Sequence, residues 1–268
     1  MGITLFVAGV TLWGAVTGLF LPRAAYRLSV DAGSAWRSAC PAGHPLTGPA
    51  GGWLGRGTCP HCPAGPPVGA ERTGTRSGRS AAVYAPAGGP VLATTLVCLA
   101  LGAGVGARPE LVAWLLLAPL TVLLCLVDRA VHRLPDVLTL PLAATTAAAL
   151  GAASLSGDPG GSWPRALLGG LVLGACYFLL FLINPRGMGF GDVKLALAVG
   201  QVLGWYGWPV LFAGTLAAFL AGAVHGLTLI ALRRADRTSP IPFGPFMAGG
   251  ALAGVMYAGL GLGAGLGL

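Results

Sequence analysis

The chain has 268 residues, of which 55% carry hydrophobic side chains and only 9% are charged, whereas a soluble domain usually has about 25% charged residues. This composition, with a mean hydropathy of +0.78 and a net charge of +8, excludes a soluble globular enzyme, a disordered chain and a disulfide scaffold. We therefore expect an all-α, polytopic bundle of membrane helices with one loop subdomain.

Apolar runs of about 20 residues predict about eight transmembrane helices. In chain order they cover residues 2–21, 90–107, 111–127, 137–154, 166–183, 193–208, 209–232 and 244–267. Only Gly207 and Pro209 separate the sixth run from the seventh. These runs predict a first transmembrane helix (1–21), a cysteine-containing loop (22–89) and a large transmembrane domain (90–268).

Basic residues lie mainly on one side of this predicted bundle. Fourteen of the sixteen Lys and Arg residues are in the first loop and in alternate later connections, whereas Arg108 and Arg165 are on the other side. The positive-inside rule then predicts a cytoplasmic loop and an N-terminus outside the cytoplasm. Because the positive charge is explained by topology, we do not expect nucleic-acid binding. Residues 1–21 lack a basic n-region and a following cleavage site, so a retained helix is expected.

Cysteine and histidine residues cluster in the first loop. Cys59 and Cys62 form a C-x-x-C pair, and Cys40 lies upstream with His44. Thiolate and imidazole ligands at such spacings suit tetrahedral Zn²⁺, and a reducing cytoplasm argues against a disulfide. The sequence predicts either a structural zinc site at Cys40, His44, Cys59 and Cys62 or a remnant that holds no metal. His61 is the alternative fourth ligand.

The positions of the eight carboxylates limit which residues are candidates for catalysis. Asp31 and Glu71 lie in the first loop, and Glu110 and Asp158 lie on the outer side. The other four lie at cytoplasmic helix ends, namely Asp128, Asp136, Asp192 and Asp236. Of the last four, Asp128 directly follows an apolar run and Asp192 directly precedes another. An ionisable group at such a depth is costly and suggests a function. The alternative is an interfacial Asp paired with Arg129 or Lys194.

Two carboxylates in one site can divide the roles of acid and base, because one holds a proton while the other stays charged. Such a pair can activate water and protonate a leaving amine, as amide hydrolysis requires. Gly189 and Gly191 would let an extended peptide approach Asp192. We assign Gly189, Gly191 and Lys194 to the substrate-binding part of the site, and we expect the Lys194 side chain to extend to the membrane interface.

Four ordered motifs resemble the type IV prepilin peptidase family, which are membrane aspartic proteases of the GxGD type. They are the segment Gly18–Leu28 that ends the first helix, the loop from Cys40 to Cys62, the pair of segments 128–141 and 189–195 around Asp128 and Asp192, and Pro242-Phe243-Gly244-Pro245-Phe246. The resemblance implies that Asp128 and Asp192 form the catalytic pair and that 90–268 is the peptidase domain. Asp136 is expected to start the next helix instead.

The resemblance also implies the substrate and the compartment. The enzyme would remove the short basic leader of a prepilin-like membrane protein at the cytoplasmic face of a bacterial inner membrane, in contact with lipid. Many family members also methylate the new N-terminus with S-adenosylmethionine, but here the upstream C-x-x-C is incomplete and Pro22 replaces a polar residue. Two alternatives are a GxGD protease for other single-span substrates and an ion- or proton-coupled carrier that uses the same two Asp residues.

Overall fold

A computed structural model describes residues 2–62, 82–156, 159–185, 187–234, 236 and 241–261. Within these residues the elements are α1 (Gly2–Leu28), α2 (Pro49–Gly52), β1 (Gly57–Cys59), β2 (Ala82–Ala85), α3 (Gly88–Val105), α4 (Glu110–Val131), α5 (Asp136–Ser154), α6 (Trp163–Ile183), α7 (Phe190–Tyr206), α8 (Trp208–Ala231) and α9 (Gly244–Gly259). Glu71, Asp158 and residues 262–267 of the last predicted span lie outside the described residues.

Each predicted span coincides with a long helix, which confirms the prediction of an all-α, polytopic membrane protein. Among the helices of the described residues, six are long and apolar enough to cross a membrane, namely α1, α3, α4, α5, α6 and α8. The helices α7 and α9 are shorter, with 17 and 16 residues. The predicted break at Gly207 is also present, because α7 ends at Tyr206 and α8 begins at Trp208.

The first helix is longer than predicted, since it continues through Pro22 to Leu28. Its last turns present Arg23 and Arg27 to the following loop, where the guanidinium groups donate hydrogen bonds to the carbonyls of Thr47 and Gly51, at 2.8 and 3.0 Å. A basic residue in the last turn also complements the partial negative charge of a helix C-terminus. The extension therefore attaches the loop to the bundle.

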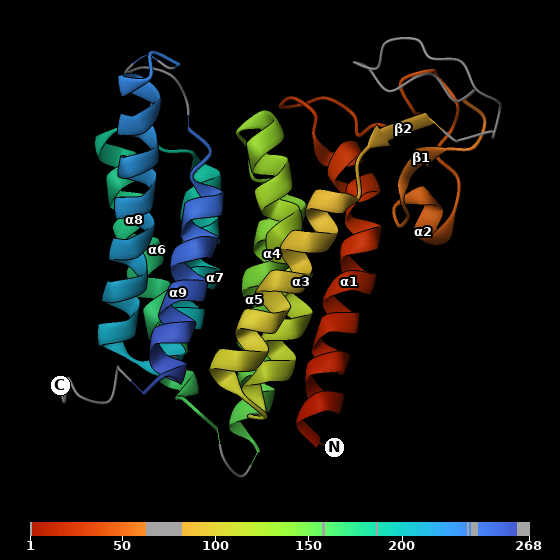
Figure 1. The fold of residues 1–268 in the computed structure, drawn as a ribbon. Helices are drawn as coiled ribbons and strands as arrows, with labels where there is room; N and C mark the ends of the chain where they lie inside the picture. Colours follow the sequence, from red (N-terminus) through yellow and green to blue (C-terminus); the bar gives the residue numbers. More distant parts are fainter. Residues whose placement is uncertain are drawn as a thin grey trace.

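The long helices form two groups that lie side by side (Figure 1). In one group α1, α3, α4 and α5 pack together, and in the other α6 packs on α7 and α8 packs on α9. Contacts of α5 with α7, and of α9 with α3 and α4, join the two groups. The boundary between the groups thus runs between α3, α4 and α5 on one side and α7 and α9 on the other, with Asp128 near the end of α4 and Asp192 near the start of α7.

Small residues allow the closest helix contacts. A Cβ added at Gly169 of α6 would lie 2.6 Å from the carbonyl oxygen of Gly200 in α7. A Cβ at Gly14 of α1 would lie 2.7 Å from the Cα of Thr95 in α3. Within a bilayer the hydrophobic effect does not drive helices together. The close packing of helix backbones is therefore a main source of association energy.

The cysteine-containing loop stands at one end of the bundle, opposite the N-terminus (Figure 1). We call this the loop end. The antiparallel pair β1–β2 brings Thr58 opposite Val83 and fixes Cys59 near the end of α1. The turn between α4 and α5, and the starts of α7 and α9, lie at the same end. Both candidate sites are therefore at the loop end.

Candidate active site

Asp128 lies in the last turn of α4 and is 4% exposed. The helix ends four residues later because His132 adopts a left-handed conformation, with φ of 50°, and its N–H donates to the carbonyl of Asp128 at 2.7 Å. Pro135 then disfavours helical geometry for Leu134. The Oδ2 atom of Asp128 accepts a hydrogen bond from the backbone N–H of Gly244, at 2.8 Å. The start of α9 thus holds this carboxylate in place.

Asp192 lies in the first turn of α7 and is also buried. Gly189 is the N-cap residue, and its carbonyl accepts the N–H of Asp192 at 3.0 Å. A carboxylate in this position is stabilised by the partial positive charge of the helix N-terminus. The short loop before α7 therefore fixes Asp192 at the same level of the bundle as the end of α4.

One cavity joins the two carboxylates. Its volume is about 310 Å³, and its walls come from the α4–α5 turn and from the start of α7. It is lined by Asp128, His132, Arg133, Leu134, Asp136, Gly189, Phe190, Gly191, Asp192 and Lys194. All five residues that the sequence assigned to catalysis and substrate binding, Asp128, Asp192, Gly189, Gly191 and Lys194, are thus in one cavity.

The Lys194 side chain reaches an exposed carboxylate at the loop end of the bundle. Its Nζ atom lies 2.6 Å from Oδ1 of Asp136 and 4.8 Å from the ring centre of Phe190. Asp136 begins α5 as predicted, but Pro135 is the N-cap residue, and the Asp136 side chain makes no capping hydrogen bond. The ion pair instead links the starts of α5 and α7 across the rim of the cavity.

The two glycines before Asp192 have different surroundings. A Cβ at Gly191 would lie 2.8 Å from the Cβ of Leu134, whereas a Cβ at Gly189 would meet Oδ2 of Asp192 at an ordinary 3.4 Å. Gly191 therefore allows the α4–α5 turn to pack against α7, in addition to the access for a substrate that the sequence suggested.

We expect Gly191→Ala to lower the rate of the leader cleavage that the resemblance implies about tenfold or more, because the added methyl group separates Leu134 from α7 and moves Asp192. Gly189→Ala should lower the rate less than Gly191→Ala does, since its methyl group meets only Oδ2 of Asp192, at an ordinary 3.4 Å, and any loss there would reflect the approach of the substrate. Steady-state kinetics of the two purified variants make the comparison. Equal losses would show that packing against Leu134 is not what requires Gly191.

The loop brings four potential metal ligands together. The ligand atoms of Cys40, His44, Cys59 and Cys62 all lie within 4.8 Å of one another. Nδ1 of His44 lies 3.6, 3.8 and 3.3 Å from the sulfur atoms of Cys40, Cys59 and Cys62, and the Cys40 and Cys62 sulfur atoms are 3.6 Å apart. Bonds of about 2.3 Å to sulfur and 2.0 Å to nitrogen give edges of roughly 3.5 to 3.8 Å in a tetrahedron. The cluster fits such an ion.

The thiols in this cluster cannot all ionise easily without a cation. Desolvation opposes ionisation of Cys40, but hydrogen bonds from Ala42 and His44 outweigh it and lower the pKa of this thiol to about 6. Desolvation and the neighbouring Cys59 and Cys40 sulfur atoms raise the pKa of Cys62 to about 12. A bound divalent cation would stabilise several thiolates together. His44, not His61, completes the group of four.

Several residues at this cavity were not predicted as site residues, among them Gly244 and His132. Gly244 touches Asp128, and His132 lines the cavity. The signal for Gly244 was present, because it lies within the Pro242–Phe246 segment that the sequence analysis noted. For His132 the spacing of four residues from Asp128 was the only indication.

Comparison with known proteins agrees with this geometry. Residues 115–229, which include both aspartates, match the model of the type IV leader peptidase family. No solved structure matches the chain. A prepilin leader peptidase/N-methyltransferase of Aeromonas salmonicida (strain A449) is 36% identical over 165 residues, which is 59% of this chain and 52% of the relative. The alignment thus spans about half the length of that protein.

Two other relatives carry the same name and are covered more fully. The protein of Aeromonas hydrophila is 35% identical over 221 residues, covering 79% of this chain and 68% of the relative. That of Burkholderia pseudomallei (strain K96243) is 31% identical over 242 residues, covering 82% and 67%. The resemblance found in the sequence motifs is thereby confirmed, and the chain belongs to the type IV leader peptidase family.

Proposed function

We propose that the chain is an aspartic endopeptidase that removes the short basic leader from type IV prepilin-like proteins. The observation that carries this proposal is the single cavity lined by Asp128 and Asp192 at one end of a membrane helix bundle. Membership in the family favours this activity over cleavage of other single-span substrates and over a carrier. The relatives' printed name supports the same substrate class.

In the proposed reaction the two carboxylates have different roles, because their surroundings differ. The N–H of Gly244 donates to Asp128 and stabilises negative charge on it, which suits Asp128 to accept a proton from the attacking water. The water oxygen forms a bond to the carbonyl carbon of the leader peptide bond. Asp192 supplies the proton that the leaving amine takes as the carbon–nitrogen bond breaks. The one proton that remains on the pair, now on Asp128, then passes to Asp192, and the starting state is restored.

We further propose that the loop end faces the cytoplasm of a bacterial inner membrane and that the N-terminus lies outside. Among the described residues, nine basic side chains belong to the loop end, namely Arg23, Arg27, Arg37, Arg56, Arg129, Arg133, Lys194, Arg233 and Arg234. Arg108 and Arg165 belong to the other end. The positive-inside rule supports this orientation, which would expose the catalytic cavity to newly made prepilins.

The loop cluster is proposed to hold a structural Zn²⁺ through Cys40, His44, Cys59 and Cys62. The ion would join the segment after α1 to strand β1 and so stabilise the fold of the loop. Its ligands come from two short stretches, 40–44 and 59–62, and the side chains of Cys40, Leu46 and Cys59 also pack in one small apolar cluster.

We expect about one equivalent of zinc in purified protein and less than about a tenth in His44→Ala, because the loss of one ligand from four leaves an incomplete tetrahedron. His61→Ala should retain the metal and serves as the matched control. Inductively coupled plasma mass spectrometry measures both variants. Zinc loss in His61→Ala with retention in His44→Ala would reverse the assignment, and less than a tenth of an equivalent in wild type would reject the site.

N-methylation of the new N-terminus with S-adenosylmethionine is a second candidate activity, favoured by the relatives' full name. If the chain has this activity, prepilin processed in its presence should carry one extra methyl group on the first residue. Mass spectrometry of the mature pilin gives the answer. If the first residue stayed unmethylated in the presence of the methyl donor, the chain would have the peptidase activity without the methyltransferase activity.

A further inference from the structure

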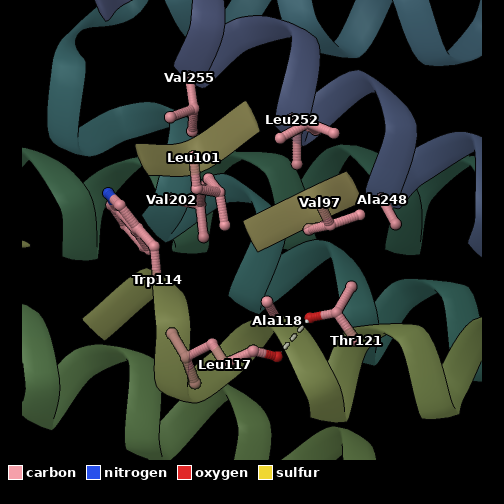
Figure 2. A pocket seen from close by; sticks show the side chains of 11 residues that line it. Val97, Leu101, Trp114, Leu117, Ala118, Thr121, Val202, Ala248, Leu252 and Val255 are labelled. Carbon is pink, nitrogen blue, oxygen red and sulfur yellow. Dashed lines mark hydrogen bonds between the residues drawn. The ribbon is translucent and has the colours of Figure 1, made fainter. Parts of the chain in front are cut away.

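An apolar cavity lies on the boundary between the two helix groups, away from the carboxylates. It has a volume of about 80 Å³, is partly open and is lined by side chains of α3, α4, α7 and α9 (Figure 2). Its only polar side-chain groups already have partners: the Thr121 hydroxyl bonds to the Leu117 carbonyl at 3.0 Å, and the Trp114 indole N–H donates to the Tyr206 hydroxyl at 2.9 Å. The cavity therefore suits an apolar ligand.

Both walls of this cavity lead toward the catalytic carboxylate. On α4 the lining residues Trp114, Ala118 and Thr121 follow one face of the helix, and seven residues beyond Thr121 the same face carries Asp128. At 1.5 Å per residue, Thr121 and Trp114 lie about 10 and 21 Å from Asp128 along the helix axis. The α4 wall thus runs from the middle of the bundle to the active site.

The α9 wall has the same course. Its lining residues Ala248, Ala251, Leu252 and Val255 recur at helical spacing from Gly244, the residue that donates its N–H to Asp128. Two helices that bound the cavity therefore meet at the carboxylate, and a chain lying along them would pass the catalytic cavity at the loop end.

We propose that this groove, defined by Trp114, Ala118, Thr121, Ala248, Ala251 and Val255, binds the apolar segment of the substrate that directly follows the cleaved bond. The inference rests on the proposed function. A leader held outside the membrane at the loop end places the cleaved bond at Asp128 and Asp192, so the next residues enter the bilayer beside α4 and α9. The alanines of both walls allow a helix to approach closely.

The size of the cavity limits what enters it. It is smaller than the roughly 150 Å³ apolar cavity that holds a benzene molecule. It therefore takes one aliphatic side chain of the substrate, while the rest of the substrate segment lies across the open side. The groove would set the register of the substrate by accepting an aliphatic side chain at one distance from the cleaved bond.

A photo-crosslinking experiment tests this placement. A benzophenone amino acid is introduced at Ala251, inside the groove, or at Ala253, which is exposed on the other side of the same helix. Both are made in the Asp192→Asn chain, co-expressed with a full-length type IV prepilin. We expect a prepilin crosslink from position 251 at least about fivefold stronger than from 253. Equal crosslinks from both positions, or capture of lipid alone at 251, would overturn the proposal.

Kinetics of the active enzyme provide the second test. Ala251→Phe fills the groove and should raise KM for full-length prepilin about tenfold with kcat within about twofold, because it removes binding and leaves the carboxylates in place. Ala253→Phe should change neither constant. Unchanged KM in Ala251→Phe would contradict the groove, whereas failure of the wild-type chain to cut prepilin would contradict the proposed function itself.

Discussion

Asp128→Asn and Asp192→Asn should each lower the rate of leader removal by about 10³-fold or more. Each substitution leaves the shape of the cavity almost unchanged but removes a group that must take up or supply a proton. Purified variants assayed on the same prepilin, with loss of the leader followed by gel shift over time, give the two rates.

Asp136→Asn is the matched control, because Asp136 lines the same cavity and carries the same charge but is 64% exposed and paired with Lys194. An exposed ion pair contributes about 1 kcal/mol or less, so the rate should stay within about fivefold of wild type. Full activity in Asp128→Asn would remove the proposed mechanism, and a loss in Asp136→Asn as large as in the other two would show that charge in the cavity, not the pair, is required.

Gly244→Ala should reduce cleavage about 100-fold, although this residue has no side chain to take part in the reaction. An added Cβ would lie 2.9 Å from Oδ2 of Asp128, so the carboxylate or the start of α9 must move. A shift of about 1 Å in a reacting group is enough to cost about two orders of magnitude. The comparison of kcat between the variant and wild type measures the effect.

Gly249→Ala provides the control for this substitution, since it lies in the same helix and a Cβ there would meet nothing within 4 Å. It should leave kcat unchanged and slightly favour the helix. If Gly244→Ala kept wild-type kcat with the same melting temperature, the hydrogen bond from Gly244 would have no part in placing Asp128.

The positions of the helices were predictable because a membrane span must be long and apolar, and this requirement is visible in a single sequence. The start of α7 is predicted within a few residues by the loop glycines before Asp192. The extension of α1 to Leu28 was not predicted, because it depends on Arg23 and Arg27 contacting loop carbonyls that are distant in sequence.

The sequence predicted which residues form the site, but it did not predict the contacts that these residues make. Chain order places Asp128 and Asp192 at one end of the bundle, but only the folded chain shows Gly244 donating to Asp128 and Lys194 paired with Asp136. In the loop, spacing left His44 and His61 as alternatives, and the tight turn in which the N–H of Cys40 bonds to the carbonyl of His44 decides between them.

Glu110 is a carboxylate whose burial the sequence did not predict. The sequence places it on the outer side, where a carboxylate would be expected to contact water. In the structure it is fully buried at the start of α4, and its Oε2 accepts the N–H of Gly160 at 3.2 Å. Its burial comes from the segment before α6 folding over α4, a long-range contact that no local pattern encodes.

The most direct test of the account is cleavage by the purified chain alone. Wild-type protein in lipid nanodiscs, incubated with a purified type IV prepilin, should yield a product whose intact mass lacks only the leader, and Asp192→Asn in the same nanodiscs should yield none. Intact prepilin after incubation with folded wild-type chain, or equal cleavage by the Asp192→Asn variant, would contradict the claim that these two aspartates form a leader peptidase.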